Sequence, residues 1–167
     1  MPAPEADRPG PAKPVFLTAL RMLAAKRLTR AQLRKKLRDR GFADEAIRDA
    51  VEECERRQYL DDRTFAQLFV ANAIERKPVG QMRLVRELIK QGVDGDLARE
   101  MAAQAESGED ERLERAIQKF EASRPGERFD RLARRLYALG YTPPAVSRAL
   151  RRRAAERAQI GELEDLK

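Results

Sequence analysis

Leucine and glycine recur along the chain in a fixed pattern. Leu33, Leu37 and Gly41 have the spacing L-x-x-x-L-x-x-x-G, which returns after 51 residues over 84–92 and after a further 48 residues over 132–140. Leucines four residues apart lie on one face of an α-helix, and glycine readily adopts the left-handed backbone conformation in which many helices end. The pattern therefore predicts three related helices, each followed by a glycine turn at Gly41, Gly92 or Gly140.

Each of these helices is flanked by two further amphipathic segments. In the first unit, apolar residues at helical spacing predict one helix over 16–28 and another over 47–54. Thr29 and Asp44 stand just before the second and third helices and are predicted N-caps. The same order in the other two units predicts an all-α chain of three tandem three-helix repeats. Because units of about 50 residues bury little surface alone, we expect them to stack into an elongated, curved array.

The expected boundaries follow from where the apolar pattern starts and stops. The first 14 residues hold five of the nine prolines and almost no large apolar side chain, so they cannot offset the entropy of ordering. We expect a disordered, proline-rich tail over 1–14, repeats over 15–58, 59–106 and 107–158, and a C-terminal tail over 159–167.

Composition agrees with helix and argues against several kinds of enzyme. The chain has 26 alanines and 18 leucines but only 12 valines and isoleucines together, which favours helix over sheet. With no histidine and one cysteine, it lacks the residues of histidine triads and of histidine or cysteine zinc sites. We expect no catalytic residue, metal or cofactor, and we expect Cys54, on an apolar face, to be a buried small side chain.

No apolar run resembles a signal peptide or a membrane span, and a lone thiol forms no intrachain disulfide. These features predict a cytoplasmic protein that does not contact membranes.

The formal net charge of +7 is concentrated toward the two ends of the repeat region. Residues 15–60 carry a net charge of +5, residues 61–108 of −1 and residues 109–167 of +3. The position two residues after the first leucine of each pattern is basic in all three units, at Lys35, Arg86 and Arg134. The candidate binding residues are Arg30, Arg34, Lys35 and Arg38 in the first unit, Arg83, Arg86 and Lys90 in the second, and Arg131, Arg134, Arg151 and Arg152 in the third.

For any single one of these residues, an ordinary solvated face with ion pairs between successive helical turns is the alternative. A basic surface suits a phosphate backbone or an acidic protein groove. The lack of tryptophan and the small number of aromatic residues argue against recognition of bases.

An acidic pair lies between the first two units, in the segment Tyr59-Leu60-Asp61-Asp62 with Phe65. Aspartate at a helix start caps free N–H groups, and Tyr59 and Leu60 are placed to pack on the entering helix. A divalent metal site is the alternative, but it needs more ligands than two adjacent carboxylates. The sequence therefore predicts a structural role for Asp61 and Asp62.

At these residues the chain resembles the RecX regulatory proteins, bacterial modulators of the RecA recombinase. The likeness is carried by the first unit over 19–42, by Tyr59-Leu60-Asp61-Asp62 with Phe65-Ala66, and by Gly80, Arg83-Leu84, Glu87-Leu88 and Gly92-Val93. Two departures stand out: Gln32 replaces a frequent glutamate, and Gln81-Met82 follow Gly80 where a proline is common. The third unit matches more loosely.

This resemblance implies a non-enzymatic regulator that binds the RecA filament on single-stranded DNA. It would inhibit the recombinase, ATPase and coprotease activities of RecA and thereby modulate recombinational repair and the SOS response. The partners expected are RecA and single-stranded or double-stranded DNA, engaged by a monomer. The alternative is a helical protein that binds DNA without sequence preference and without RecA.

Overall fold

The computed structural model describes residues 12–105 and 107–164, and in these ranges the protein forms nine α-helices and no strand. The helices follow one another in three groups of three. The first group is α1 (Lys13–Ala25), α2 (Arg30–Arg38) and α3 (Asp44–Arg56), the second is α4 (Asp62–Arg76), α5 (Gln81–Lys90) and α6 (Gly95–Ala103), and the third is α7 (Glu109–Ser123), α8 (Phe129–Ala138) and α9 (Pro143–Glu164).

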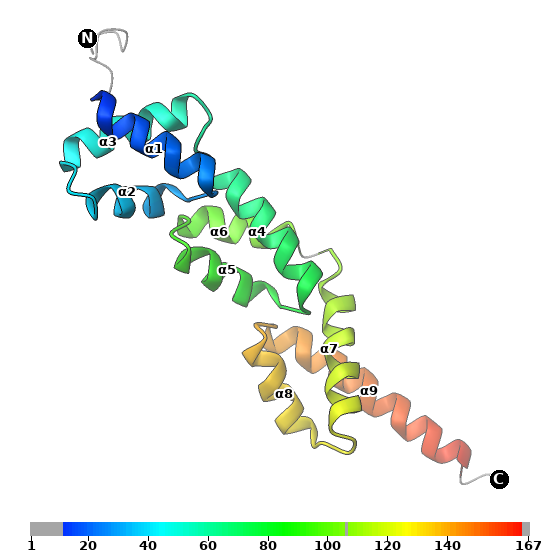
Figure 1. Ribbon diagram of the computed structural model, residues 1–167. Coiled ribbons are helices and arrows are strands. Elements are labelled where there is room, and N and C mark those ends of the chain that lie inside the picture. The colour runs from blue at the N-terminus through cyan, green and yellow to red at the C-terminus, as the bar shows by residue number, and fades with distance from the viewer. Residues whose placement is uncertain (1–11, 106, 165–167) are drawn as a thin grey trace.

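The three groups lie one after another along a single direction, with the first group at one end of the array and α9 at the other (Figure 1). Each group has its own hydrophobic core, and the helices of a group pack mainly on one another. The array is therefore elongated because no single core joins the three repeats. This arrangement confirms the predicted fold class of tandem helical repeats.

The register leucines form the centre of each core. Leu37, Leu88 and Leu136 are completely buried, and the first leucine of each pattern is at most 1% exposed. The glycines that follow have φ angles of +84° (Gly41) and +88° to +89° (Gly92 and Gly140), a conformation that other residues adopt only at a cost. These turns direct the next residue back to the core.

The residue after each glycine packs into or against its core. Val93 and Tyr141 are buried, and Phe42 packs on the first core while partly exposed. Burial raises the pKa of the Tyr141 hydroxyl above its ordinary value. The Tyr141 hydroxyl has no hydrogen-bond partner among the described residues, so this side chain acts mainly as an apolar group.

The second and third helices of the first repeat begin within one residue of the predicted positions. Thr29 is the N-cap of α2 and forms a capping box with Gln32, in which each side chain binds the other residue's backbone N–H. At α3 the prediction was wrong by one residue, because Ala43 is the N-cap and Asp44 is the first helical residue. The Asp44 carboxylate pairs with Arg38 instead of capping its own helix.

The helices at the two ends of the chain extend beyond the predicted repeats. α1 begins at Lys13, so Lys13 and Pro14 are helical, as the tolerance of the first helical turn for proline allows. α9 continues to Glu164, beyond residue 158, through the segment QIGELE, in which glutamine, glutamate and leucine are good helix formers. Residues 1–11 and 165–167 of the predicted tails lie outside the described residues.

Cys54 is fully buried in the first core, and burial raises the pKa of its thiol to about 11. The thiol is therefore protonated at neutral pH and packs as a small apolar side chain. Among the helices that the structure describes, none combines the length and apolar character needed to cross a membrane.

Candidate functional site

The position two residues after the first register leucine places one cation on the outside of each repeat. Lys35 on α2, Arg86 on α5 and Arg134 on α8 are all exposed. Figure 1 shows that α2, α5 and α8 lie along the same side of the array. The three repeats thus present equivalent cations on one side of the molecule.

Three of the four candidate cations on α2 pair with carboxylates of their own repeat, and Arg34 pairs with none that the structure describes. Exposed pairs of this kind contribute little to stability and are weakened by salt. Arg34 is therefore the one candidate cation of α2 that forms no ion pair with a described carboxylate, and its side chain is partly exposed. The pairs are Arg30–Glu55 (Nε to Oε1, 3.4 Å), Lys35–Asp39 (Nζ to Oδ2, 2.9 Å) and Arg38–Asp44 (Nη2 to Oδ1, 3.0 Å).

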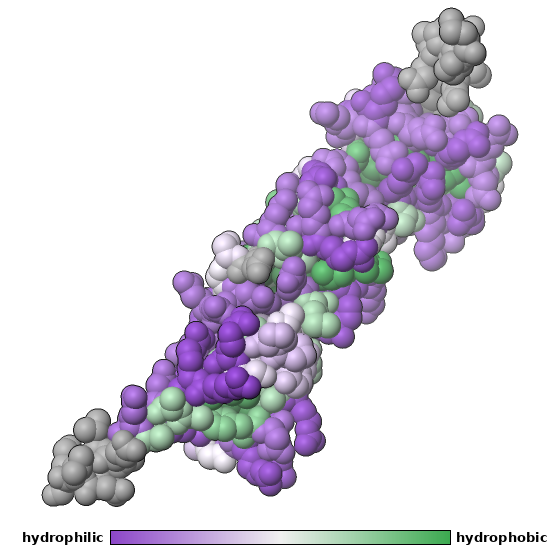
Figure 2. Space-filling view, turned by 180° about the vertical axis from the view of Figure 1, so that it is seen from behind, coloured by the Kyte–Doolittle hydropathy of each residue, from purple (hydrophilic) through white to green (hydrophobic). Residues whose placement is uncertain are grey.

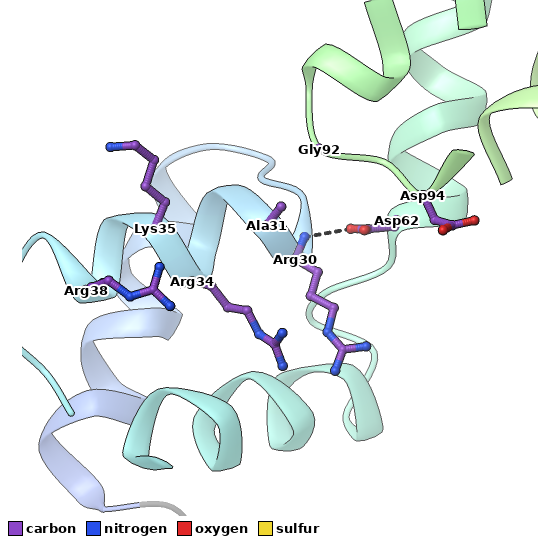
Figure 3. Close-up of a pocket in the computed structure, with 8 residues that line it drawn as sticks. All are labelled: Arg30, Ala31, Arg34, Lys35, Arg38, Asp62, Gly92 and Asp94. Carbon is purple, nitrogen blue, oxygen red and sulfur yellow. Dashed lines mark hydrogen bonds between the residues drawn. The ribbon is translucent and has the colours of Figure 1, made fainter. Parts of the chain in front are cut away.

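The candidate residues of α2 border a groove of about 380 Å³ at the junction of the first and second repeats. In Figure 3 the Arg30 and Arg34 side chains extend toward α3, whereas Lys35 points away from it. Four cations and two carboxylates give the groove a net positive charge, which suits a phosphate or carboxylate group. The lining residues are Arg30, Ala31, Arg34, Lys35, Arg38, Asp62, Gly92 and Asp94.

The third repeat carries a second set of exposed cations. Arg131 on α8 and Arg151 and Arg152 on α9 are exposed and form no ion pair with a described carboxylate. Arg134 lies 3.5 Å from Asp130 (Nη2 to Oδ2), one helical turn earlier. This end of the array therefore retains several cations for binding.

Two other arginines of α9 hold that helix against α7 and are not part of this exposed set. Arg153 contacts Glu114 and Glu121, and Arg157 also contacts Glu121. The Arg157 guanidinium lies 5.1 Å from the centre of the Phe129 ring as well. Some arginines of α9 therefore pack against α7, and others are exposed to solvent.

In the second repeat the three candidate cations differ in accessibility. Arg86 and Lys90 are exposed and have no ion pair with a described carboxylate. Arg83 is partly buried, and its backbone and Cβ adjoin Gly140 of the third repeat so closely that a Cβ on Gly140 would lie 2.4 Å from that of Arg83. Arg83 is therefore a junction residue as much as a surface cation.

The two adjacent aspartates have different roles. Asp61 is the N-cap of α4, where it accepts hydrogen bonds from the Arg63 backbone N–H at 2.9 Å and from the Thr64 hydroxyl. The Thr64 hydrogen bond is the main reason that the pKa of Asp61 is lowered. Asp62 instead accepts from the backbone N–H of Arg30 at 2.7 Å, and burial raises its pKa.

The remaining residues of this segment divide between two repeats. Leu60 is buried in the first core, and Phe65 packs against the second, where its ring stacks on that of Phe69 at 6.3 Å. Tyr59 is 53% exposed, so about half of its surface remains in solvent. In the part of the chain that the structure describes, no three carboxylate or thiol groups gather as metal ligands would.

The first two repeats are joined by polar contacts to the start of α2. The Thr29 hydroxyl, on a fully buried side chain, donates to the Gln91 carbonyl at 2.8 Å. The Gln32 side-chain amide donates to the side-chain carbonyl of Gln91 at 2.9 Å. Gln32, which stands where glutamate is frequent in the family, therefore has a hydrogen-bond partner in the second repeat. Together with Asp62, these contacts fix the end of α5 and the start of α4 against α2.

The second and third repeats are joined in the same way at the start of α5. The Gly80 N–H donates to the Leu139 carbonyl at 2.9 Å, and the Gln81 N–H donates to the Glu109 carboxylate at 2.9 Å. The Gln81 contact requires a backbone N–H, which a proline at this position would lack. A Cβ on Gly80 would lie 2.4 Å from the Gly140 backbone, so only glycine allows this approach.

Arg112 completes the second junction and was not among the residues that the sequence indicated. It is 4% exposed, and its guanidinium donates to the carbonyls of Ala105, Val79 and Ser107. In the sequence it is one of many arginines on an amphipathic helix, so nothing marks it as buried. Glu109 and Gln91 were missed for the same reason, because their partners lie far away along the chain.

Comparisons with known proteins agree with this architecture. Two sequence models match the chain: RecX, first three-helix domain, over residues 16–54, and RecX, second three-helix domain, over residues 61–101. The regulatory protein RecX of Trichlorobacter lovleyi is 34% identical over 140 residues, which cover 84% of this chain and 81% of that protein. The chain belongs to the RecX family. The regulatory protein RecX of Chlorobium phaeobacteroides is 29% identical, over 75% of this chain and 82% of that protein.

Solved structures of RecX proteins share the fold. The crystal structure of RecX from Lactobacillus salivarius has a TM-score of 0.77, and the match covers 83% of this chain and 94% of that one at 15% identity. A second crystal structure of regulatory protein RecX has a TM-score of 0.72, covering 80% and 68% of the two chains at 17% identity. The arrangement of three-helix units in this chain is therefore the fold of solved RecX proteins.

Proposed function

We propose that this RecX-family protein binds along the RecA filament on single-stranded DNA and inhibits its recombinase, ATPase and coprotease activities. Through this inhibition it would modulate recombinational DNA repair and the SOS response. It acts as a cytoplasmic monomer, without enzymatic activity or a cofactor.

The observation that carries the proposal is the presence, on both end repeats of one elongated array, of cations that form no described ion pair. Arg34 in the first repeat and Arg131, Arg151 and Arg152 in the third have no described carboxylate as a partner. An extended molecule with a contact region at each end spans neighbouring protomers of a filament better than a compact one. Two weak contacts made by one molecule also reinforce each other through effective concentration.

The second candidate function is DNA binding without RecA, and the same unpaired arginines favour it. Phosphate binding by cations releases counterions, so affinity for bare DNA falls steeply as salt rises. A ligand of the protein filament depends instead on RecA being present. Partner dependence and salt dependence therefore separate the two functions.

The test is to measure binding of the labelled protein to single-stranded DNA with and without RecA, between about 50 and 200 mM salt. The proposal predicts tight binding to RecA-coated DNA at the upper end of this range and weak binding to bare DNA there. Equal affinity for bare and coated DNA, with a steep loss as salt rises, would favour the DNA-binding function. No binding to either would contradict both.

A further inference from the structure

The outer side of α5 differs from those of α2 and α8 in carrying two exposed apolar side chains. Met82 is 49% exposed and Ile89 is 47% exposed. Residues seven apart lie on nearly the same side of a helix, and Arg86 lies between them on that side. We call Met82, Arg86 and Ile89 the α5 stripe.

The repeat register shows that one of these two positions, that of Ile89, is apolar in both later repeats but not in the first. The position directly after the second register leucine is Arg38 in the first repeat, Ile89 in the second and Tyr137 in the third. Tyr137 is 40% exposed, so α8 continues the apolar character of α5. The same side of the array therefore changes from cationic on α2 to partly apolar on α5 and α8.

The charges around the stripe indicate the chemistry of a partner. Arg86 and Lys90 are exposed and have no ion pair with a described carboxylate, although the repeat as a whole is nearly neutral. A complementary surface would place apolar side chains against Met82 and Ile89 and carboxylates near the two cations.

From this pattern we propose that the α5 stripe docks on protein, against an apolar surface flanked by carboxylates on a protomer of the filament. The inference rests on the proposed function and adds to it which repeat meets the protein component.

Two physical arguments favour protein over nucleic acid at this position. The side chains of Met82 and Ile89 carry no charge and no hydrogen-bond donor with which to bind a phosphate group. Methionine, tyrosine and arginine, in contrast, are enriched in protein interfaces. Single exposed apolar residues are ordinary, whereas exposed apolar side chains that lie together on one side of a helix form the kind of patch that marks an interaction site. Figure 2 shows that small hydrophobic areas interrupt an otherwise hydrophilic surface on the face that it presents.

The register supplies a test in which the two kinds of partner predict opposite results. Ile89→Arg gives the second repeat the residue that the first repeat already carries there, Arg38. If the stripe meets protein, this change buries a charge against an apolar surface and weakens binding. If the stripe meets phosphates, the added cation strengthens binding and makes it more sensitive to salt.

The matched control is Leu68→Arg. Leu68 is 40% exposed, but it lies on α4, the first helix of the same repeat, and outside the stripe. Both variants add one positive charge at a half-exposed apolar site, and arginine is a good helix former, so both should keep the helical signal. Met82→Gln serves as a second stripe variant that removes an apolar contact without adding charge.

The measurement is the affinity of each full-length variant for RecA-coated and for bare single-stranded DNA at about 150 mM salt. We expect Ile89→Arg to lose about tenfold or more in affinity for coated DNA, and Met82→Gln about threefold or more, with Leu68→Arg unchanged. Binding to bare DNA should not weaken in any variant.

Unchanged or tighter binding of Ile89→Arg to coated DNA would overturn the inference while leaving the proposed function intact. An equal loss in Leu68→Arg would also overturn it, because the effect would then come from charge or folding and not from the stripe. Failure of the wild-type protein to prefer coated over bare DNA would overturn the proposed function, and the inference with it.

Discussion

The carboxylate of Asp62, the first residue of α4, accepts a hydrogen bond from the backbone N–H of Arg30, the first residue of α2. Glu109, the first residue of α7, makes the equivalent contact with the N–H of Gln81, the first residue of α5. The second and third repeats thus each provide a carboxylate that accepts a hydrogen bond from a free N–H at the start of the second helix of the preceding repeat. This contact, used twice, fixes how successive repeats stack.

The first prediction concerns Asp62. Asp62→Ala should lower the free energy of unfolding by about 1 to 2 kcal/mol, because it leaves the Arg30 N–H without its acceptor. Asp62→Asn should be mild, since an amide oxygen can accept the same hydrogen bond. Denaturant unfolding measures both, and equal losses in the two variants would show that the contact is not a simple cap.

The Asp62→Asn variant should also respond differently to pH. Burial raises the pKa of Asp62 in the folded protein, so the folded state binds the proton more tightly than the unfolded chain. The stabilising contribution of this group is therefore complete at low pH and is lost as pH rises through the raised pKa. Asparagine does not titrate, so the stability of Asp62→Asn relative to wild type should improve between about pH 3 and pH 7.

The second prediction uses the three glycine turns as matched sites. All three have positive φ, so alanine imposes a similar backbone cost of about 1 kcal/mol at each. Only Gly92 and Gly140 adjoin another repeat, where a new Cβ would lie 2.6 Å from the Ala31 Cβ and 2.4 Å from the Arg83 Cβ, whereas Gly41 has open space. Alanine should therefore destabilise the protein more at Gly92 and Gly140 than at Gly41.

Thermal unfolding of the three alanine variants measures this difference. Equal melting temperatures would mean that neighbouring repeats can move apart to make room for the new Cβ without loss of stability. The stacking of repeats would then contribute little to the free energy of unfolding.

The third prediction tests the cores. Leu88 has no exposed surface, so Leu88→Ala should cost about 2 to 5 kcal/mol through lost burial and a residual cavity. Leu37→Ala and Leu136→Ala should behave alike, because they occupy the same place in the other repeats. The exposed Leu68→Ala is the control and should cost less than about 1 kcal/mol. A neutral result at Leu88 would contradict the repeat register.

The sequence predicted the parts of this structure that depend on local periodicity. The L-x-x-x-L-x-x-x-G pattern placed the second helix of each repeat, its buried leucines and its glycine turn, because helix periodicity and glycine geometry act within a few residues. The capping box at Thr29 and Gln32 is local in the same sense. Asp44 was misplaced by one residue, which is the usual uncertainty at a helix start.

The junctions could not be predicted, because their partners are distant in sequence. Thr29 meets Gln91 across 62 residues, and Asp62 meets Arg30 across 32. A carboxylate at a helix start is expected to cap its own helix, as Asp61 does, and nothing in the local sequence indicates that the next residue caps another. The candidate cations were assigned from charge alone, and their roles in binding stay predictions.

The fourth prediction concerns the candidate cations at the two ends that form no described ion pair. Reversing Arg34 in the first repeat, or Arg131 and Arg151 in the third, should weaken binding to the RecA filament, because these cations lack a described carboxylate partner and are free to attract an acidic surface. Helicity should be unchanged, since charged side chains at the surface that form no ion pair contribute little to folding. Lys119→Glu on α7, another exposed cation without a described partner, is the control and should bind like wild type.

The most direct test of the account is the rate of ATP hydrolysis by RecA on single-stranded DNA as the protein is added. Wild-type protein should lower this rate, either single-end reversal should shift the inhibition to higher concentration, and Arg34→Glu combined with Arg131→Glu and Arg151→Glu should nearly abolish it. Wild-type protein that leaves the rate unchanged would contradict regulation of RecA. A combined variant that inhibits at wild-type concentrations would contradict binding through the two basic ends.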